Sequence, residues 1–252
     1  MSDLDVFDLG KVGDFNYKVI GLSKIGLSHV KNGIENQDSF GFHKSLNSVM
    51  LAVADGVGSC PSSKHGSIYA IETIMALQDK IDRDQIKAYA SNKIKDFIIR
   101  EWKGKIKGVL RDYSTTVKFV IISASYILLG GIGDGEIFLS VDNSEYQIRS
   151  HSELFSNMTY SLTQYIDVSK FEIIKINIPM DAKAFNVFIG TDGITCELES
   201  GKEMDFLKYI SKEVREDIDN YEDEIIKWIN TLQEKNGDDK TMLVFTAERG
   251  TL

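Results

Sequence analysis

Two apolar segments that lie far apart in the sequence end in the same way, with an aspartate followed by a glycine. Residues 51–59 read LAVADGVGS, and residues 184–193 read AFNVFIGTDG. A weaker version, ILLGGIGDGEIFL, places Asp134 after a glycine-rich run. A short apolar run bounded by a turn signal is typical of a buried strand. The sequence therefore predicts strands that carry Asp55, Asp134 and Asp192 to the edge of a core.

Carboxylates at the ends of buried strands need a compensating partner. They lose hydration there unless they are paired or bound to a cation. Converging carboxylates repel one another, and a hard divalent cation relieves this repulsion best. Asn36-Gln37-Asp38 and Asp238-Asp239 fit the same pattern. Because no cluster of histidines and cysteines accompanies these aspartates, zinc is disfavoured, whereas ligand sets made only of oxygen select magnesium, manganese or calcium.

Hydrophobic periodicity predicts the regular elements. Alternating or continuous apolar runs indicate strands, and apolar residues at helical spacing indicate amphipathic helices. The expected strands cover residues 17–25, 39–43, 49–54, 115–123, 125–129, 136–141, 146–149, 172–178, 183–190 and 241–247. The expected helices cover residues 62–80, a segment that begins at Asp82 as N-cap and ends near Gly104 and Gly108, and residues 203–214 and 221–235. Residues 1–16 are expected to form a loose lead-in or an edge strand.

The order of these elements predicts an α+β fold. Strands and helices come in separate runs, without the strict alternation of α/β proteins. A β-sandwich of two antiparallel sheets flanked by helix pairs would use the elements economically, and the first three strands would form an antiparallel meander. Residues 151–169 show no clear period and are expected to form a surface flap. No linker or repeat divides the chain, so we expect one domain over residues 1–252.

Composition excludes several classes of function. The formal net charge of −9 argues against a nucleic-acid partner, which would require a basic face. Cys60 and Cys196 are too few for a disulfide scaffold. The N-terminus lacks the pattern of a signal peptide, and no apolar run approaches the roughly 18 residues of a membrane span. The sequence therefore predicts a cytoplasmic protein that does not enter a membrane.

Taken together and in order, the motifs resemble a known family. The series NQD, VADGVGS, STT, GDGEIFL, GTDGIT and GDDKTMLVF resembles the metal-dependent protein phosphatases of the PPM class, type 2C. The loop with Ser28-His29 ahead of Asn36-Gln37-Asp38 resembles a bacterial sub-branch of this family. The resemblance covers nearly the whole chain and implies the same sandwich fold. It also implies a monomeric serine/threonine phosphoprotein phosphatase that acts opposite a protein kinase. In such an enzyme a hydroxide bridging two Mn²⁺ or Mg²⁺ ions attacks a phosphomonoester.

The resemblance also implies roles for individual residues. Asp55 would bridge the two ions, and the carbonyl of Gly56 would complete the shell of one of them. Asp192 and Asp238 would bind the second ion, so that Asp55, Asp192 and Asp238 act through the metal-bound water. Asp38 would contact the cluster directly or through water.

Other positions depart from the family pattern. Asp134 would help to hold a third, weaker ion, but Gly135-Glu136 stands where the family usually has Ser-Arg. Gln37 replaces the usual glutamate, and Asp239 stands where the family usually has asparagine. We expect Gln37 and Asp239 to contact ligands or metal-bound water rather than the ions, although Asp238 and Asp239 would be able to exchange roles.

The residues expected to protonate the leaving group and to bind the substrate phosphate also differ from the family pattern. Val57 stands where some relatives have a histidine that acts as general acid, so either a metal-bound water protonates the leaving group or only good leaving groups react fast. Gly33 stands where many relatives have a phosphate-binding arginine. His29 and Lys31 precede this position, and we expect one of them to bind the substrate phosphate instead. The alternatives to an active enzyme are a catalytically weak phosphatase-fold module that binds phosphoproteins or regulates a partner, and a calcium-stabilised structural domain.

Overall fold

The computed structural model describes residues 6–149, 159–216 and 221–250, and within them two antiparallel sheets form a sandwich. The first sheet has the spatial order β1 (Val6–Val12), β2 (Phe15–Lys24), β11 (Lys240–Arg249), β10 (Ala184–Gly190), β7 (Glu136–Val141) and β8 (Ser144–Ile148). The second has the order β3 (Ser39–Lys44), β4 (Ser48–Ala54), β5 (Val117–Ser123), β6 (Tyr126–Ile132) and β9 (Glu172–Asn177). This arrangement confirms the fold class predicted from the sequence.

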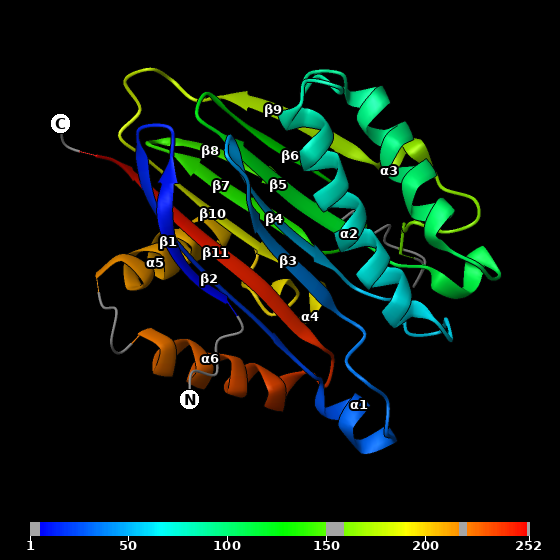
Figure 1. Ribbon diagram of the computed structural model, residues 1–252. Helices are drawn as coiled ribbons and strands as arrows, with labels where there is room; N and C mark the ends of the chain where they lie inside the picture. The colour runs from blue at the N-terminus through cyan, green and yellow to red at the C-terminus, as the bar shows by residue number, and fades with distance from the viewer. Residues whose placement is uncertain (1–5, 150–158, 217–220, 251–252) are drawn as a thin grey trace.

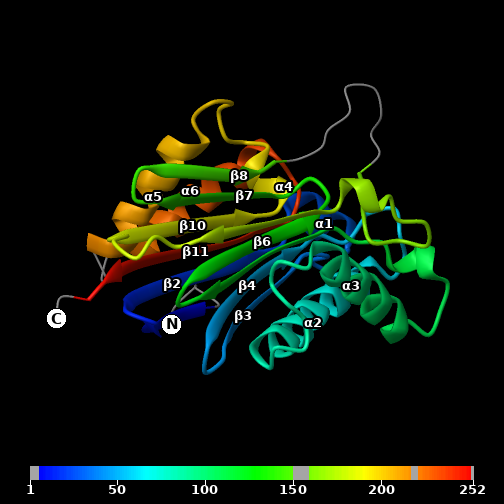
Figure 2. The ribbon, with the colours of Figure 1, turned by 90° about the horizontal axis from the view of Figure 1, so that it is seen from above.

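A pair of helices covers the outer face of each sheet (Figures 1 and 2). Helices α2 (Ser63–Asp82) and α3 (Ser91–Lys105) pack on the second sheet, and α5 (Glu203–Glu216) and α6 (Tyr221–Lys235) pack on the first. Four short helices lie in the connections: α1 (Leu27–Asn32), η1 (Leu110–Tyr113), η2 (Val168–Lys170) and α4 (Asp192–Thr195). None of these four was expected from the sequence, because each is too short to show a helical period.

The core has three layers, one between the sheets and one under each helix pair. Strand β5 shows how the layers arise from sequence. Phe119 and Ile121 face α2 and α3, whereas Val120 and Ile122 lie between the sheets. Because successive side chains of a strand point to opposite faces, a strand covered on both faces must be apolar at nearly every position. This explains the continuous apolar runs found in the sequence.

Two local predictions were wrong. Strand β2 does not join β3 and β4 in a meander, because it pairs with β1 and β11 in the opposite sheet. Asp82 does not begin a helix, because α2 continues through it and α3 starts only at Ser91. The Asp82 carboxylate instead accepts hydrogen bonds from the hydroxyls of Ser45 and Ser48, the latter at 2.8 Å. A long-range partner therefore uses the side chain that looked like a helix cap.

The expected flap is described only from residue 159 onward, and the rest of it lies outside the described residues. The described part returns to the second sheet. Leu162 is buried and pairs with Thr115 through two backbone hydrogen bonds, of 2.8 and 3.1 Å. In the described ranges, no helix is both long and apolar enough to cross a membrane.

Candidate metal centre

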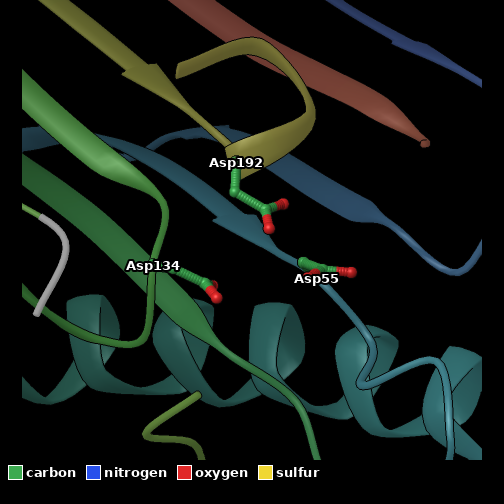
Figure 3. Close-up of side chains that lie close together, drawn as sticks. All are labelled: Asp55, Asp134 and Asp192. Carbon is green, nitrogen blue, oxygen red and sulfur yellow. The ribbon is translucent and has the colours of Figure 1, made fainter. Parts of the chain in front are cut away.

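Three aspartates from separate strand ends come together at one end of the sandwich. Asp55 follows directly after β4, Asp134 lies in the turn between β6 and β7, and Asp192 begins α4 after β10. One carboxylate oxygen of each lies within 4.8 Å of the other two. Figure 3 shows the three side chains near one another at the ends of their strands. The structure thus brings together three of the aspartates that the sequence analysis singled out.

The glycines that follow two of these aspartates are required by packing. A Cβ on Gly193 would lie 1.9 Å from the carbonyl oxygen of Asp239, and a Cβ on Gly56 would lie 2.8 Å from the carbonyl oxygen of Ser63. Both obstacles are backbone atoms, which cannot move aside as a flexible side chain can. The Asp-Gly pairs therefore allow neighbouring chain segments to approach the carboxylates closely.

The backbone of Asp55 is fixed by the two threonines of the STT motif. Thr116 accepts a hydrogen bond from the Asp55 amide through Oγ1 at 3.0 Å and donates its own amide to the Asp55 carbonyl at 2.8 Å. The Thr115 hydroxyl donates to the same carbonyl at 2.8 Å. Sequence reasoning gave these threonines no role, because the hydrogen bonds depend on the pairing of β4 with β5.

Asp38 adds a fourth, buried carboxylate. Thr191 donates its hydroxyl to Oδ2 of Asp38 at 2.8 Å, and this threonine directly precedes Asp192. Burial raises the pKa of Asp38 to about 7, although hydrogen bonds from Thr241 and Thr191 act in the opposite direction. Asp38 is therefore placed to hold a proton in the absence of a cation and to lose it when a cation binds.

The other carboxylates are perturbed in the same direction. Burial, followed by the charges of Asp134 and Asp238, raises the pKa of Asp192 to about 7. Burial also raises the pKa of Asp55 well above its ordinary value, and the charges of Asp38, Asp192, Asp134 and Asp238 raise it further. A divalent cation would relieve this repulsion because it favours the ionised form of every carboxylate around it.

The donor set fits a hard divalent ion. All candidate ligand atoms are oxygens, the chemistry that selects Mg²⁺ or Mn²⁺ over zinc. Oδ2 of Asp134 accepts a hydrogen bond from Thr159 at 2.5 Å. Oδ1 of Asp134 is buried and has no hydrogen-bond partner among the described residues. A bound cation would supply the partner that this oxygen lacks.

Asp238 and Asp239 have different surroundings. Asp238 is exposed, and its charge acts on Asp55 and Asp192. The side chain of Asp239 is only 2% exposed, and its carboxylate accepts backbone hydrogen bonds from Gly26 at 2.7 Å and Gln37 at 2.6 Å. The structure thus does not bring Asp238 into the group of three converging carboxylates, although its charge reaches them, whereas Asp239 anchors two loops to the start of β11.

The two residues expected to bind phosphate both lie on α1. His29 is 17% exposed, and its Nδ1 lies 2.9 Å from Oδ1 of Asp239. Lys31 is exposed on the same short helix. Gln37, whose amide donates to the same Asp239 carboxylate, has a buried Oε1 with no hydrogen-bond partner among the described residues. The Asp239 carboxylate therefore holds both His29 and the Gln37 backbone, and its charge acts on Asp38, while Lys31 is exposed on α1.

Comparisons with known proteins agree with this geometry. The sequence profile of the family described as protein phosphatase 2C matches residues 25–236. No curated protein sequence matches the chain.

Several crystal structures share the fold. RsbX in complex with magnesium has a TM-score of 0.59 at 16% identity, over 96% of this chain and 100% of that chain. The catalytic domain of the serine/threonine phosphatase PstP in complex with two manganese ions gives 0.64 at 15%, over 92% and 98%. PstP/Ppp of Mycobacterium tuberculosis gives 0.62 at 15%, over 93% and 99%. At these identities the likeness establishes the fold alone.

Proposed function

The chain belongs to the protein phosphatase 2C family, and from this premise we propose that it is a metal-dependent phosphatase of phosphoserine and phosphothreonine in proteins. One observation carries the proposal: carboxylate oxygens of Asp55, Asp134 and Asp192 lie within 4.8 Å of one another. A binding module would not need to bring these mutually repelling groups together. Mn²⁺ or Mg²⁺ is the proposed cofactor, since the donors are all oxygens and two structures of the same fold were solved with these ions.

In the proposed site each residue has a role that its surroundings support. Asp55 would bridge two ions with help from the carbonyl of Gly56, Asp192 and Asp238 would hold the second ion, and Asp38 would complete the cluster. Two divalent ions, when bound, lower the pKa of a coordinated water and neutralise charge on phosphate oxygens. The chain itself fixes the backbone of Asp55 through Thr115 and Thr116, and the carboxylate of Asp38 through Thr191.

The substrate phosphate is proposed to bind next to α1. Nδ1 of His29 faces the Asp239 carboxylate. This contact orients the imidazole so that Nε2 points away from Asp239. The other ring nitrogen would donate to a phosphate oxygen, and Lys31 on the same helix would add a positive charge.

Kinetics of two single variants test this role of α1. His29→Ala and Lys31→Ala are each expected to raise KM for a phosphothreonine peptide. Because each variant loses one charge-assisted hydrogen bond to the phosphate, kcat/KM should fall by about 10-fold or more. Lys93→Ala, which removes an exposed lysine from α3, is the matched control and should behave like the wild type. Unchanged kinetics in both α1 variants would remove these residues from phosphate binding.

Turnover by the wild type tests the proposed activity. We expect hydrolysis of p-nitrophenyl phosphate and of a phosphothreonine peptide with Mn²⁺ or Mg²⁺, and none after chelation. Stabilisation by Ca²⁺ without hydrolysis would support a structural domain instead. Binding of the phosphopeptide without turnover would support the catalytically weak module. Gly33 and Gln37 favour this alternative, because they stand where relatives have an arginine and a glutamate.

The wider setting is part of the same proposal. A phosphoprotein phosphatase acts opposite a protein kinase, and we propose that this chain does so as a monomeric, single-domain cytoplasmic enzyme. The net charge of −9 supports a protein rather than a nucleic-acid partner.

A further inference from the structure

Within the described ranges two lysines are almost completely buried, and backbone carbonyls explain the position of only one of them. Lys240 is 0% exposed, and its Nζ donates to the carbonyls of Asn236 at 2.8 Å and Asp238 at 3.0 Å. It therefore holds the turn before β11. Lys118 is 2% exposed on β5, in a strand that is otherwise largely apolar. A buried ammonium is costly unless nearby negative charge compensates it, so its position needs a reason.

The Lys118 side chain crosses β6 and lies beside the turn that carries Asp134. Lys118 pairs with Gly131 on β6, and Gly131 pairs with Glu172 on β9. A Cβ on Gly131 would lie 2.6 Å from Cδ of Lys118, so the lysine stem crosses β6 where a side chain is missing. A Cβ on Gly135 would lie 3.5 Å from Cγ of the same lysine. The stem thus runs directly beside the turn that carries Asp134.

The charges around the ammonium fit this position. Glu172, Asp134 and Glu136 act on it in that order, and all three favour the protonated form. Burial outweighs them and lowers the pKa of Lys118 to about 8. Asp134 is the one member of the carboxylate cluster that acts on both Lys118 and Asp55.

We propose that Lys118 is a built-in cation beside Asp134, and that its ammonium keeps a further divalent ion away from this side of a site occupied by two divalent ions. The inference rests on the proposed function. Asp134 acts on both Asp55 and Lys118, and Glu172 and Glu136 act on Lys118 as well, so the ammonium lies among the carboxylates at this edge of the cluster. A further divalent ion beside Asp134 would be repelled by the ammonium.

Calorimetric titration with Mn²⁺ tests this role directly, since it measures stoichiometry rather than activity. We expect two ions to bind to the wild type and to Lys118→Arg, which keeps the charge. Lys118→Met keeps the stem that crosses Gly131 but removes the charge, and should bind an additional Mn²⁺ at least about 10-fold more tightly than the wild type binds any ion beyond two. Lys118→Gln, with a polar end group, makes the same test if the methionine variant does not fold.

The outcomes separate this inference from the proposed function. Two ions of unchanged affinity in the folded Lys118→Met or Lys118→Gln variant would overturn the role of Lys118 and leave the phosphatase proposal standing. A wild type that binds no Mn²⁺ would overturn both. Thermal unfolding of each metal-free variant shows whether the protein is folded, and a merely structural lysine would change the unfolding temperature without changing the stoichiometry.

Discussion

Asp55→Asn is expected to lower metal-dependent turnover by at least about 100-fold, because it removes the carboxylate that the proposed mechanism places between two ions. The amide has the same shape, so the backbone hydrogen bonds to Thr115 and Thr116 should persist. The measurement is kcat/KM for p-nitrophenyl phosphate and for a phosphothreonine peptide, in Mn²⁺ and in Mg²⁺.

The same substitution should have the opposite effect on the stability of the metal-free protein. Burial and four neighbouring aspartates disfavour the charged form of Asp55, and a neutral amide does not bear this cost. We expect the unfolding temperature of the chelated protein to rise by at least about 2 °C and the further rise on adding Mn²⁺ to disappear.

A matched control excludes a general effect of removing an acid. Asp79→Asn breaks an exposed ion pair between Asp79 on α2 and Arg83, the residue after this helix, and should leave both activity and metal response unchanged. Wild-type turnover in Asp55→Asn, or turnover that does not depend on metal, would contradict the proposed centre. A loss of activity together with a lower metal-free unfolding temperature would indicate damage to the fold rather than to the chemistry.

The second large effect concerns pH. Asp38 and Asp192 have pKa values of about 7 in the folded protein, against about 4 in an unfolded chain. Between these values the folded state binds more protons than the unfolded state, so stability falls as pH rises. The metal-free protein should therefore lose at least about 2 kcal/mol of unfolding free energy between pH 5 and pH 8.

Bound metal should reverse this dependence. Divalent ions compete with protons for the same carboxylates, so their stabilising effect grows as the pH rises through 7. Urea denaturation at pH 5 and pH 8, with chelator and with excess Mn²⁺, measures both trends. Asp38→Asn should reduce the loss seen with chelator, because the amide does not titrate. A metal-free protein that is as stable at pH 8 as at pH 5 would contradict the raised pKa values.

Much of the site could be predicted from the sequence because its chemistry is local. An apolar run followed by Asp-Gly indicates a strand that ends in a carboxylate, and this pattern alone points to Asp55 and Asp192. The α+β class was equally accessible, because the order of strand and helix periods limits the possible architectures. The close packing at Gly193 explains why this position has glycine, since a side chain would not fit there.

The positions that sequence reasoning missed depend on partners far along the chain. Asp82 has the pattern of a helix cap, but the hydroxyls of Ser45 and Ser48 lie against its carboxylate. Asp238 and Asp239 are adjacent and chemically identical, and only their surroundings separate the exposed carboxylate from the one that anchors Gly26 and Gln37.

By itself, the sequence determined most of the long strands and helices and the carboxylates at the strand ends, because hydrophobic period and turn residues act over a few positions. The tertiary structure decided which sheet β2 joins, which aspartates share one space, and where the Lys118 side chain lies. These depend on strand register, which is fixed by the combined burial of both sheet faces rather than by any single segment. The presence of a lysine in an apolar strand can be explained only from the register, which aligns Gly131 and Glu172 beside Lys118.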